Sequence, residues 1–120
     1  MTARIVLIED DPDIAALVAE MLTELGHHVE VRRDLADGAT DPDTQLVITD
    51  LVAIRSYDPP AARDWIARVR ATFPGAAVVV STAHAPAGAA GPAALGADAV
   101  LTKPFDIAVF AETVESLLDR

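Results

Sequence analysis

The segment Gln45-Leu46-Val47-Ile48-Thr49-Asp50-Leu51 places a short apolar run between polar neighbours. Strands of a parallel sheet are covered on both faces, so they form continuous apolar runs and need not alternate. The segment therefore predicts a buried parallel strand that ends at Asp50. In open parallel sheets ligands bind beyond the carboxyl ends of the strands, so a carboxylate at this position faces a cleft instead of the core.

Four other segments are expected to join this strand in one sheet. They are rich in aliphatic residues and are bounded by polar or turn-forming residues, as strands are. The second of them alternates apolar and polar side chains, which predicts a position nearer the edge of the sheet. The four segments are residues 4–8, 28–32, 76–81 and 99–102.

Three longer segments show the periodicity of amphipathic helices. Asp11 and Pro12 begin the first, and Gly26 ends it. Pro60 begins the second, and Asp106 caps the third. The side chains expected to be buried are Ile14, Leu17, Val18, Met21, Leu22 and Leu25 in the first helix, Ala62, Trp65, Ile66, Val69 and Phe73 in the second, and Ile107, Phe110, Val114, Leu117 and Leu118 in the third.

Three weaker signals complete the assignment of elements. Short helices are expected at residues 35–39 and 92–95, where nearby Gly and Pro leave room for little more than one turn. Trp65 belongs to a helical stripe, so we assign it to core packing and not to ligand stacking. His27 and His28 lack the residue spacing of a metal site and are expected at the surface or at a loop end.

Strands and helices alternate along the chain, which is the βαβ order of a doubly wound parallel sheet. We therefore expect an α/β fold in which a five-stranded parallel sheet carries helices on both faces, with residues 1–120 forming a single domain. Right-handed crossovers bring the carboxyl ends of all the strands to one edge.

The composition excludes several classes of function. The chain of 120 residues has 19 Asp and Glu against 9 Lys and Arg, a formal net charge of −10. This charge repels phosphate backbones and argues against direct nucleic-acid binding. The absence of cysteine excludes disulfides and thiolate metal sites. No apolar run is long enough to span a bilayer and the first residues do not read as a signal peptide, so we expect a cytoplasmic protein without a membrane partner.

The residues at the predicted strand ends form a coherent chemical set. Glu9 and Asp10 follow the first strand, Asp50 the third, Thr82 the fourth and Lys103 the fifth. Carboxylates that share a cleft repel one another unless a cation joins them, and oxygen ligands of this kind suit Mg²⁺. A carboxylate can also accept a phosphoryl group, with a metal, a lysine and a hydroxyl stabilising the charge on the transferred oxygens.

With these residues in place, the chain resembles the receiver domain of two-component response regulators. The resemblance covers nearly the whole chain, in the family's order and at nearly its spacing. The motifs that carry it are Ile5-Val6-Leu7-Ile8-Glu9-Asp10-Asp11-Pro12, Leu46-Val47-Ile48-Thr49-Asp50-Leu51, Val78-Val79-Val80-Ser81-Thr82-Ala83, and Gly96-Ala97-Asp98 leading to Lys103-Pro104-Phe105-Asp106.

The resemblance implies a metal site and an acceptor at the carboxyl edge. By it, Asp50 is the phospho-acceptor, and Glu9 and Asp10 are the acidic pair that binds Mg²⁺. In the family the metal is also bound by the acceptor and by the backbone carbonyl two residues beyond it, which here belongs to Val52.

The resemblance also implies roles for two residues that face the phosphoryl group. Thr82 would hydrogen-bond it, and Lys103 would form an ion pair with it. In the family a cis peptide, here Lys103-Pro104, aims the lysine into the site.

The function implied by the family is a signalling switch and not an enzyme that acts on a separate substrate. A sensor histidine kinase or a phosphotransfer protein would supply the phosphoryl group from a phosphohistidine. An output partner and a homodimer through the fourth helix, fifth strand and fifth helix are also typical of the family. The chain stops where the last helix should end, which fits both a stand-alone receiver and a segment of a longer regulator.

The sequence departs from the family pattern around the site and not within it. The aromatic residue that the family places three positions before the lysine is Val100 here. The loop after Asp50 lacks the usual Pro and Asp-Gly pair, and the fourth-helix segment is rich in Gly and Pro. We therefore expect a phosphorylatable receiver with an atypical output surface.

Three alternatives remain open at the level of sequence. The first is a receiver-like module that signals by binding alone. The second is a small Mg²⁺ phosphohydrolase of the haloacid-dehalogenase type, which would want a second Asp where Val52 stands. The third is a flavodoxin-like nucleotide binder, but no Gly-rich phosphate loop follows the first strand, where Glu9-Asp10-Asp11 stands instead.

Overall fold

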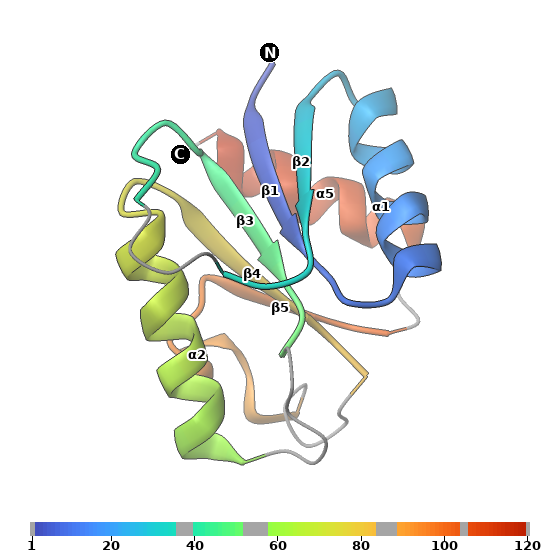
Figure 1. The fold of residues 1–120 in the computed structure, drawn as a ribbon. Coiled ribbons are helices and arrows are strands. Elements are labelled where there is room, and N and C mark those ends of the chain that lie inside the picture. Colours follow the sequence, from blue (N-terminus) through green and yellow to red (C-terminus); the bar gives the residue numbers. More distant parts are fainter. Residues whose placement is uncertain (1, 36–39, 52–57, 84–88, 104–105, 120) are drawn as a thin grey trace.

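The strands form one five-stranded, all-parallel sheet in the order β2-β1-β3-β4-β5 (Figure 1). The computed structural model describes residues 2–35, 40–51, 58–83, 89–103 and 106–119. The strands are β1 (Arg4–Ile8), β2 (His28–Arg32), β3 (Leu46–Thr49), β4 (Ala77–Thr82) and β5 (Ala99–Thr102). The doubly wound α/β fold expected from the sequence is confirmed, with β2 at an edge.

Helices cover both faces of this sheet (Figure 1). On one face, α2 (Pro59–Thr72) and α4 (Pro92–Leu95) supply apolar side chains, and on the other face α1 (Pro12–Glu24) and α5 (Ile107–Leu118) do so. The predicted helix at residues 92–95 is confirmed, and α2 begins one residue before the predicted start. Most of the predicted helix at residues 35–39 lies outside the described residues.

Alternation along each strand divides the core into two clusters. Val47 and Val78 point into the cluster under α2, whereas Ile48 and Val79 point into the cluster under α1 and α5. Successive side chains of a strand point to opposite faces, so both faces of these strands are filled by aliphatic residues. Thr49 is fully buried and follows the same alternation, which turns it toward α2.

Local capping signals set the helix starts as the sequence predicts. Asp11 Oδ1 accepts hydrogen bonds from Asp13 N at 2.9 Å and Ile14 N at 3.2 Å. Asp106 Oδ1 caps α5 in the same way, with its nearer donor at 2.7 Å. Side-chain acceptors at this position satisfy the first amide groups of a helix, which otherwise lack partners. Gly26, after α1, has the positive φ of 94° expected at a helix end.

The buried faces of α1 and α5 differ in part from the prediction. Leu17 is 59% exposed and Ile107 is 68% exposed, although both were expected in the core. The α1 helix packs through Ala15, Val18 and Leu22, which share one face of the helix, and Leu17 lies away from that face. Leu25, also predicted to be buried, is 37% exposed at the C-cap. The prediction was wrong at these three positions.

The sequence analysis expected His27 and His28 at the surface or at a loop end. His28 is exposed, whereas His27 is buried at the end of the loop that joins α1 to β2. Nδ1 of His27 accepts a hydrogen bond from Ala3 N at 3.1 Å, and Nε2 of His27 lies 2.9 Å from Glu115 Oε1. Because a backbone N–H can only donate, Nδ1 must accept with its lone pair. The ring proton is then on Nε2, which donates a hydrogen bond to Glu115. His27 thus connects the start of β1 to α5.

Among the described helices, none combines the length and the apolar character that crossing a membrane requires.

Replacing His27 by Ala is expected to lower the free energy of unfolding by about 2 kcal/mol, because the change leaves the buried Ala3 N–H without its acceptor and opens a cavity. The matched change His28→Ala, next to it but exposed, should stay within about 0.5 kcal/mol of the wild type. Urea unfolding followed by circular dichroism measures both. Equal effects of the two changes would contradict the role given to His27.

Candidate functional site

Three site residues follow three different strands and meet at the carboxyl edge of the sheet. Each is the first residue past its strand, and its N–H still bonds to the last residue of the neighbouring strand. These bonds run from Glu9 N to Arg32 O at 2.9 Å, from Asp50 N to Ile8 O at 2.9 Å and from Lys103 N to Thr82 O at 2.7 Å. The sheet therefore fixes the backbone from which each side chain extends.

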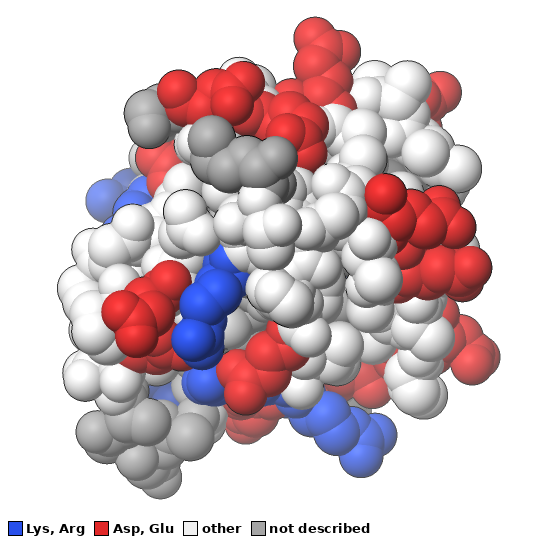
Figure 2. Space-filling view, turned by 90° about the horizontal axis from the view of Figure 1, so that it is seen from above, with Lys and Arg blue, Asp and Glu red and all other residues white. Residues whose placement is uncertain are grey.

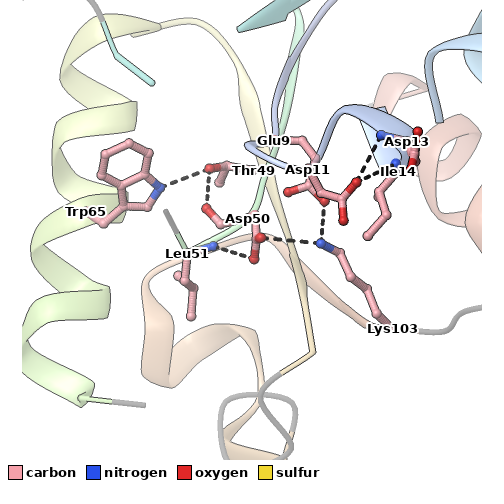
Figure 3. Close-up of polar contacts among 9 residues, drawn as sticks. All are labelled: Glu9, Asp11, Asp13, Ile14, Thr49, Asp50, Leu51, Trp65 and Lys103. Atoms are coloured by element: carbon pink, nitrogen blue, oxygen red, sulfur yellow. Dashed lines mark hydrogen bonds and ion pairs between the residues drawn. The ribbon is translucent and has the colours of Figure 1, made fainter. Parts of the chain in front are cut away.

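The ammonium group of Lys103 lies between two carboxylates (Figure 3). Its Nζ is 2.5 Å from Glu9 Oε1 and 3.4 Å from Asp50 Oδ2. The side chain of Lys103 is 14% exposed, that of Glu9 is 3% exposed and that of Asp50 is 21% exposed. Asp50 is thus the member of this group that solvent reaches most easily, while Glu9 is nearly enclosed.

The environment of Glu9 disfavours its charged form. Desolvation by burial raises the pKa of the Glu9 carboxyl from 4.5 to about 7, against the opposing effect of the hydrogen bond from Lys103. The neighbouring Asp50 carboxylate also contributes to this rise, by less than burial does. Glu9 Oε2 is buried and has no hydrogen-bond partner among the described residues. One lysine therefore compensates the charge of these carboxylates only in part.

The acidic residues at this edge fit a divalent cation. Glu9, Asp10 and Asp50 can each direct one oxygen to a common point, because these oxygens lie within 4.8 Å of one another. Asp10 is exposed, so the group is open to solvent. The unpartnered oxygen of Glu9 provides a further acceptor. Hard oxygen ligands with room for retained waters are the set that Mg²⁺ prefers.

Burial and mutual distance distinguish this group from the other acidic residues. Figure 2, which views the molecule from the end where the strands begin, shows several separate groups of Asp and Glu on that remote face. With a net charge of −10, acidic neighbours are common on this surface. A cluster of exposed acidic side chains differs from this group, in which the Glu9 carboxylate is enclosed and lies next to Lys103.

The carboxylate of Asp50 is also held from its own loop. Leu51 N donates to Asp50 Oδ1 at 2.8 Å, so one oxygen accepts this bond while the other faces Lys103 (Figure 3). The two oxygens therefore have different surroundings, and the side chain is restrained in one orientation.

Thr82 is the last residue of β4 and is fully buried. It lies two positions past Val80, which pairs with Thr49, and its carbonyl accepts the N–H of Lys103. The structure thus places Thr82 one strand away from the Asp50 strand, at the same edge. Val52 and Pro104, to which the sequence assigned a metal-binding carbonyl and a cis peptide, lie outside the described residues.

Two residues that the sequence analysis did not assign to the site lie behind Asp50: Thr49 contacts its backbone carbonyl, and Trp65 contacts Thr49. Trp65 Nε1 donates to Thr49 Oγ1 at 2.9 Å, and Thr49 Oγ1 lies 2.7 Å from the carbonyl oxygen of Asp50. Trp65 is buried, as predicted from its helical stripe, but its indole N–H also makes this polar contact. The signal available in the sequence was a polar Thr at the end of an apolar strand.

The α2 helix also holds the segment that follows β4. Arg63 donates to Ala94 O at 3.0 Å, and Arg70 donates to Gly96 O at 2.9 Å. Arg70 also lies 3.2 Å from Asp98 Oδ2, which accepts the N–H of Val78. This pair of arginines ties the short α4 to α2 and to β4.

No protein-family model matches this chain, and no curated protein matches it.

Solved structures match it over its full length. The BeF3-activated DrrB receiver domain is 25% identical over 100% of both chains, with a TM-score of 0.73. NtrX from Brucella abortus is 27% identical over 99% of this chain and 27% of its own, with a TM-score of 0.74. The receiver domain of sensor histidine kinase PA1611 from Pseudomonas aeruginosa, with a magnesium ion in its active site cleft, is 21% identical over 100% of both chains, with a TM-score of 0.75.

Without divalent cations, the wild type should lose stability relative to Glu9→Gln as the pH rises from about 5 to about 8. The unfolded carboxyl ionises near 4.5 and the folded one near 7, so in this range folding retains a proton that the unfolded chain has released. Stability then falls with rising pH, whereas Gln does not titrate. The difference between the two proteins should change by on the order of 2 kcal/mol.

Urea unfolding in EDTA across this pH range measures the effect, with Glu20→Gln on the exposed side of α1 as the control. A difference between wild type and Glu9→Gln that is constant with pH would contradict the raised pKa.

Proposed function

We propose that this chain, a receiver domain of the response-regulator type by its fold and its full-length structural match, is a phosphorylation-dependent switch with Asp50 as the acceptor. The single observation that supports this most strongly is the position of Lys103 between Glu9 and Asp50 at the carboxyl edge. An ammonium group there can compensate the charge that a phosphoryl group would bring to Asp50.

In the proposed reaction, a carboxylate oxygen of Asp50 attacks the phosphorus atom of a phosphohistidine. The new O–P bond forms as the N–P bond breaks, and the electron pair of the broken bond stays on the imidazole nitrogen, which takes up a proton. Hydrolysis of the acyl phosphate by water later releases inorganic phosphate and restores the carboxylate. The donor would be a sensor histidine kinase or a phosphotransfer protein.

The residues around Asp50 have distinct proposed roles. Glu9, Asp10 and Asp50 would hold Mg²⁺, together with the backbone carbonyl of Val52. When bound, the ion neutralises charge on the transferred oxygens. Lys103 would form an ion pair with the phosphoryl group, and this requires its ammonium to shift from Glu9 toward Asp50.

The hydroxyl of Thr82 is proposed to donate to a phosphoryl oxygen. Its place at the end of β4, one strand from Asp50, supports this role. The reaction modifies the chain itself, so the protein acts as a signalling module and not as an enzyme with a separate substrate.

The output of the switch is proposed to be atypical. Val100 is half-buried and packs against the core under α2, where the resemblance would place an aromatic side chain. Val100 has no aromatic ring, so the output cannot depend on a rotamer change of an aromatic side chain at this position. This observation also favours one alternative function, signalling by protein binding without phosphorylation.

Incubation with acetyl phosphate and Mg²⁺ should add one phosphoryl group, about 80 Da, to the wild type. The adduct should be labile and absent from Asp50→Asn, because an amide cannot act as the nucleophile. Asp43→Asn, an exposed change in the turn before β3, should be modified like the wild type. Intact-mass spectrometry measures all three. A wild type that stays unmodified, also with a phosphorylated kinase, would point to signalling by binding alone.

Replacing Lys103 by Met should separate metal binding from phosphoryl transfer. The ammonium competes with a cation for the same carboxylates, so its loss should tighten Mg²⁺ binding by roughly threefold to tenfold. Phosphorylation by acetyl phosphate should slow at least tenfold, because the compensating charge is lost. Calorimetric titration and mass spectrometry measure the two effects. Arg4→Met is the control, because Arg4 lies at the start of β1, at the end of the strand opposite to Glu9. Weaker Mg²⁺ binding in Lys103→Met would contradict this description of the site.

A further inference from the structure

A continuous series of hydrogen bonds leads from α2 to the carboxylate of Asp50 (Figure 3). It begins at the indole of Trp65, whose Nε1 lies 2.9 Å from Thr49 Oγ1. It continues from Thr49 Oγ1 to the carbonyl oxygen of Asp50 at 2.7 Å. It ends where Leu51 N lies 2.8 Å from Asp50 Oδ1. The whole series connects a helix side chain to the proposed phospho-acceptor.

The chemistry of the groups fixes the direction of every bond. The indole N–H only donates, and a backbone carbonyl only accepts. The Thr49 hydroxyl must therefore accept from Trp65 and place its single proton on the carbonyl of Asp50. All donors point the same way, toward the carboxylate, and hydrogen bonds aligned in this manner polarise one another.

The planar peptide between Asp50 and Leu51 joins the two halves of the series. Its carbonyl accepts from Thr49, and its N–H donates to Asp50 Oδ1. Because the peptide group is rigid and planar, holding the carbonyl also holds the N–H. The hydroxyl of Thr49 therefore sets the direction from which the carboxylate of Asp50 is held.

Burial keeps the hydrogen bonds of Thr49 and Trp65 in place. Thr49 is fully buried and Trp65 is 6% exposed, so water does not replace either bond at low cost. Trp65 belongs to the stripe of α2 that packs on the sheet, which leaves the indole little freedom to move. The helix thus supplies a fixed donor to the strand that carries Asp50.

We propose that Thr49 and Trp65 are positioning residues for phosphorylation, in which the indole orients the Thr49 hydroxyl and the hydroxyl orients the peptide that restrains the Asp50 carboxylate. This inference rests on the proposed function, because it concerns the rate at which Asp50 accepts a phosphoryl group. It assigns Thr49 and Trp65 no contact with the phosphoryl group itself.

The series also makes Trp65 a reporter of the state of Asp50. Phosphorylation converts a carboxylate into an acyl phosphate, whose oxygen is a weaker acceptor for Leu51 N–H. The polarisation of the series then falls, and the environment of the indole N–H changes. Trp65 is the single tryptophan of the chain, so its fluorescence emission reports this change without interference.

The test compares Thr49→Val, which removes the hydroxyl at nearly constant shape, with Thr49→Ser, which keeps it. Mass spectrometry measures the rate of phosphorylation by acetyl phosphate and Mg²⁺, and circular dichroism checks that each variant is folded. Thr49→Val should react about tenfold more slowly than the wild type, and Thr49→Ser no more than about threefold more slowly. Trp65→Phe should slow the reaction about threefold, and Thr49→Val/Trp65→Phe should be no slower than Thr49→Val alone.

A second measurement uses beryllofluoride with Mg²⁺ as a stable probe of the phosphorylated state. The Trp65 emission of the wild type and of Thr49→Ser should change on its addition, and that of Thr49→Val should not. A purely structural role for Thr49 would alter stability without abolishing this change.

The outcomes separate this inference from the proposed function. A wild type that takes up no phosphoryl group overturns both. A wild type that is phosphorylated, with a folded Thr49→Val that reacts at the same rate, overturns only the positioning role. Equal slowing of Thr49→Val and Thr49→Ser overturns it as well, since the hydroxyl would then not be the cause. If Thr49→Val does not fold, an unchanged rate in Trp65→Phe overturns it.

Discussion

The parallel hydrogen-bond ladder continues one residue past the strands, and the site depends on this extension. Glu9, Asp50 and Lys103 each donate a backbone N–H to a neighbouring strand, so their side chains start from fixed points at one edge. Holding the Glu9 carboxylate there has an electrostatic cost, because burial, and to a lesser degree the neighbouring Asp50 carboxylate, raises its pKa. The two aliphatic clusters on either side of the sheet provide the stability that offsets it.

The features that sequence could predict are those set by neighbours in the chain. Asp11 and Asp106 cap helices through donors two and three residues away, so their motifs are local. The strand ends that carry the site follow from the parallel topology. The burial of His27 could not be predicted, because its partners lie 24 and 88 residues away. The exposure of Leu17 also depends on packing, because Ala15, Val18 and Leu22 form the side of α1 that meets the sheet.

Within the site, too, the features set by topology were predictable and those set by packing between distant residues were not. The acidic group and Lys103 were predicted because strand ends converge at one edge, and the structure brings Glu9, Asp50 and Lys103 into contact. The bond between Trp65 and Thr49 was not predicted, since it depends on the rotation of α2 over β3. Periodicity identified Trp65 as a core residue, and it is one. It does not indicate where the polar edge of a buried ring points.

The arginines of α2 recognise main-chain oxygens in the α4 segment, at Ala94 and Gly96. Every amino acid supplies such an oxygen, so these contacts place little demand on the identity of the side chains they hold. The exposed residues of the segment can therefore change while its attachment to α2 is retained.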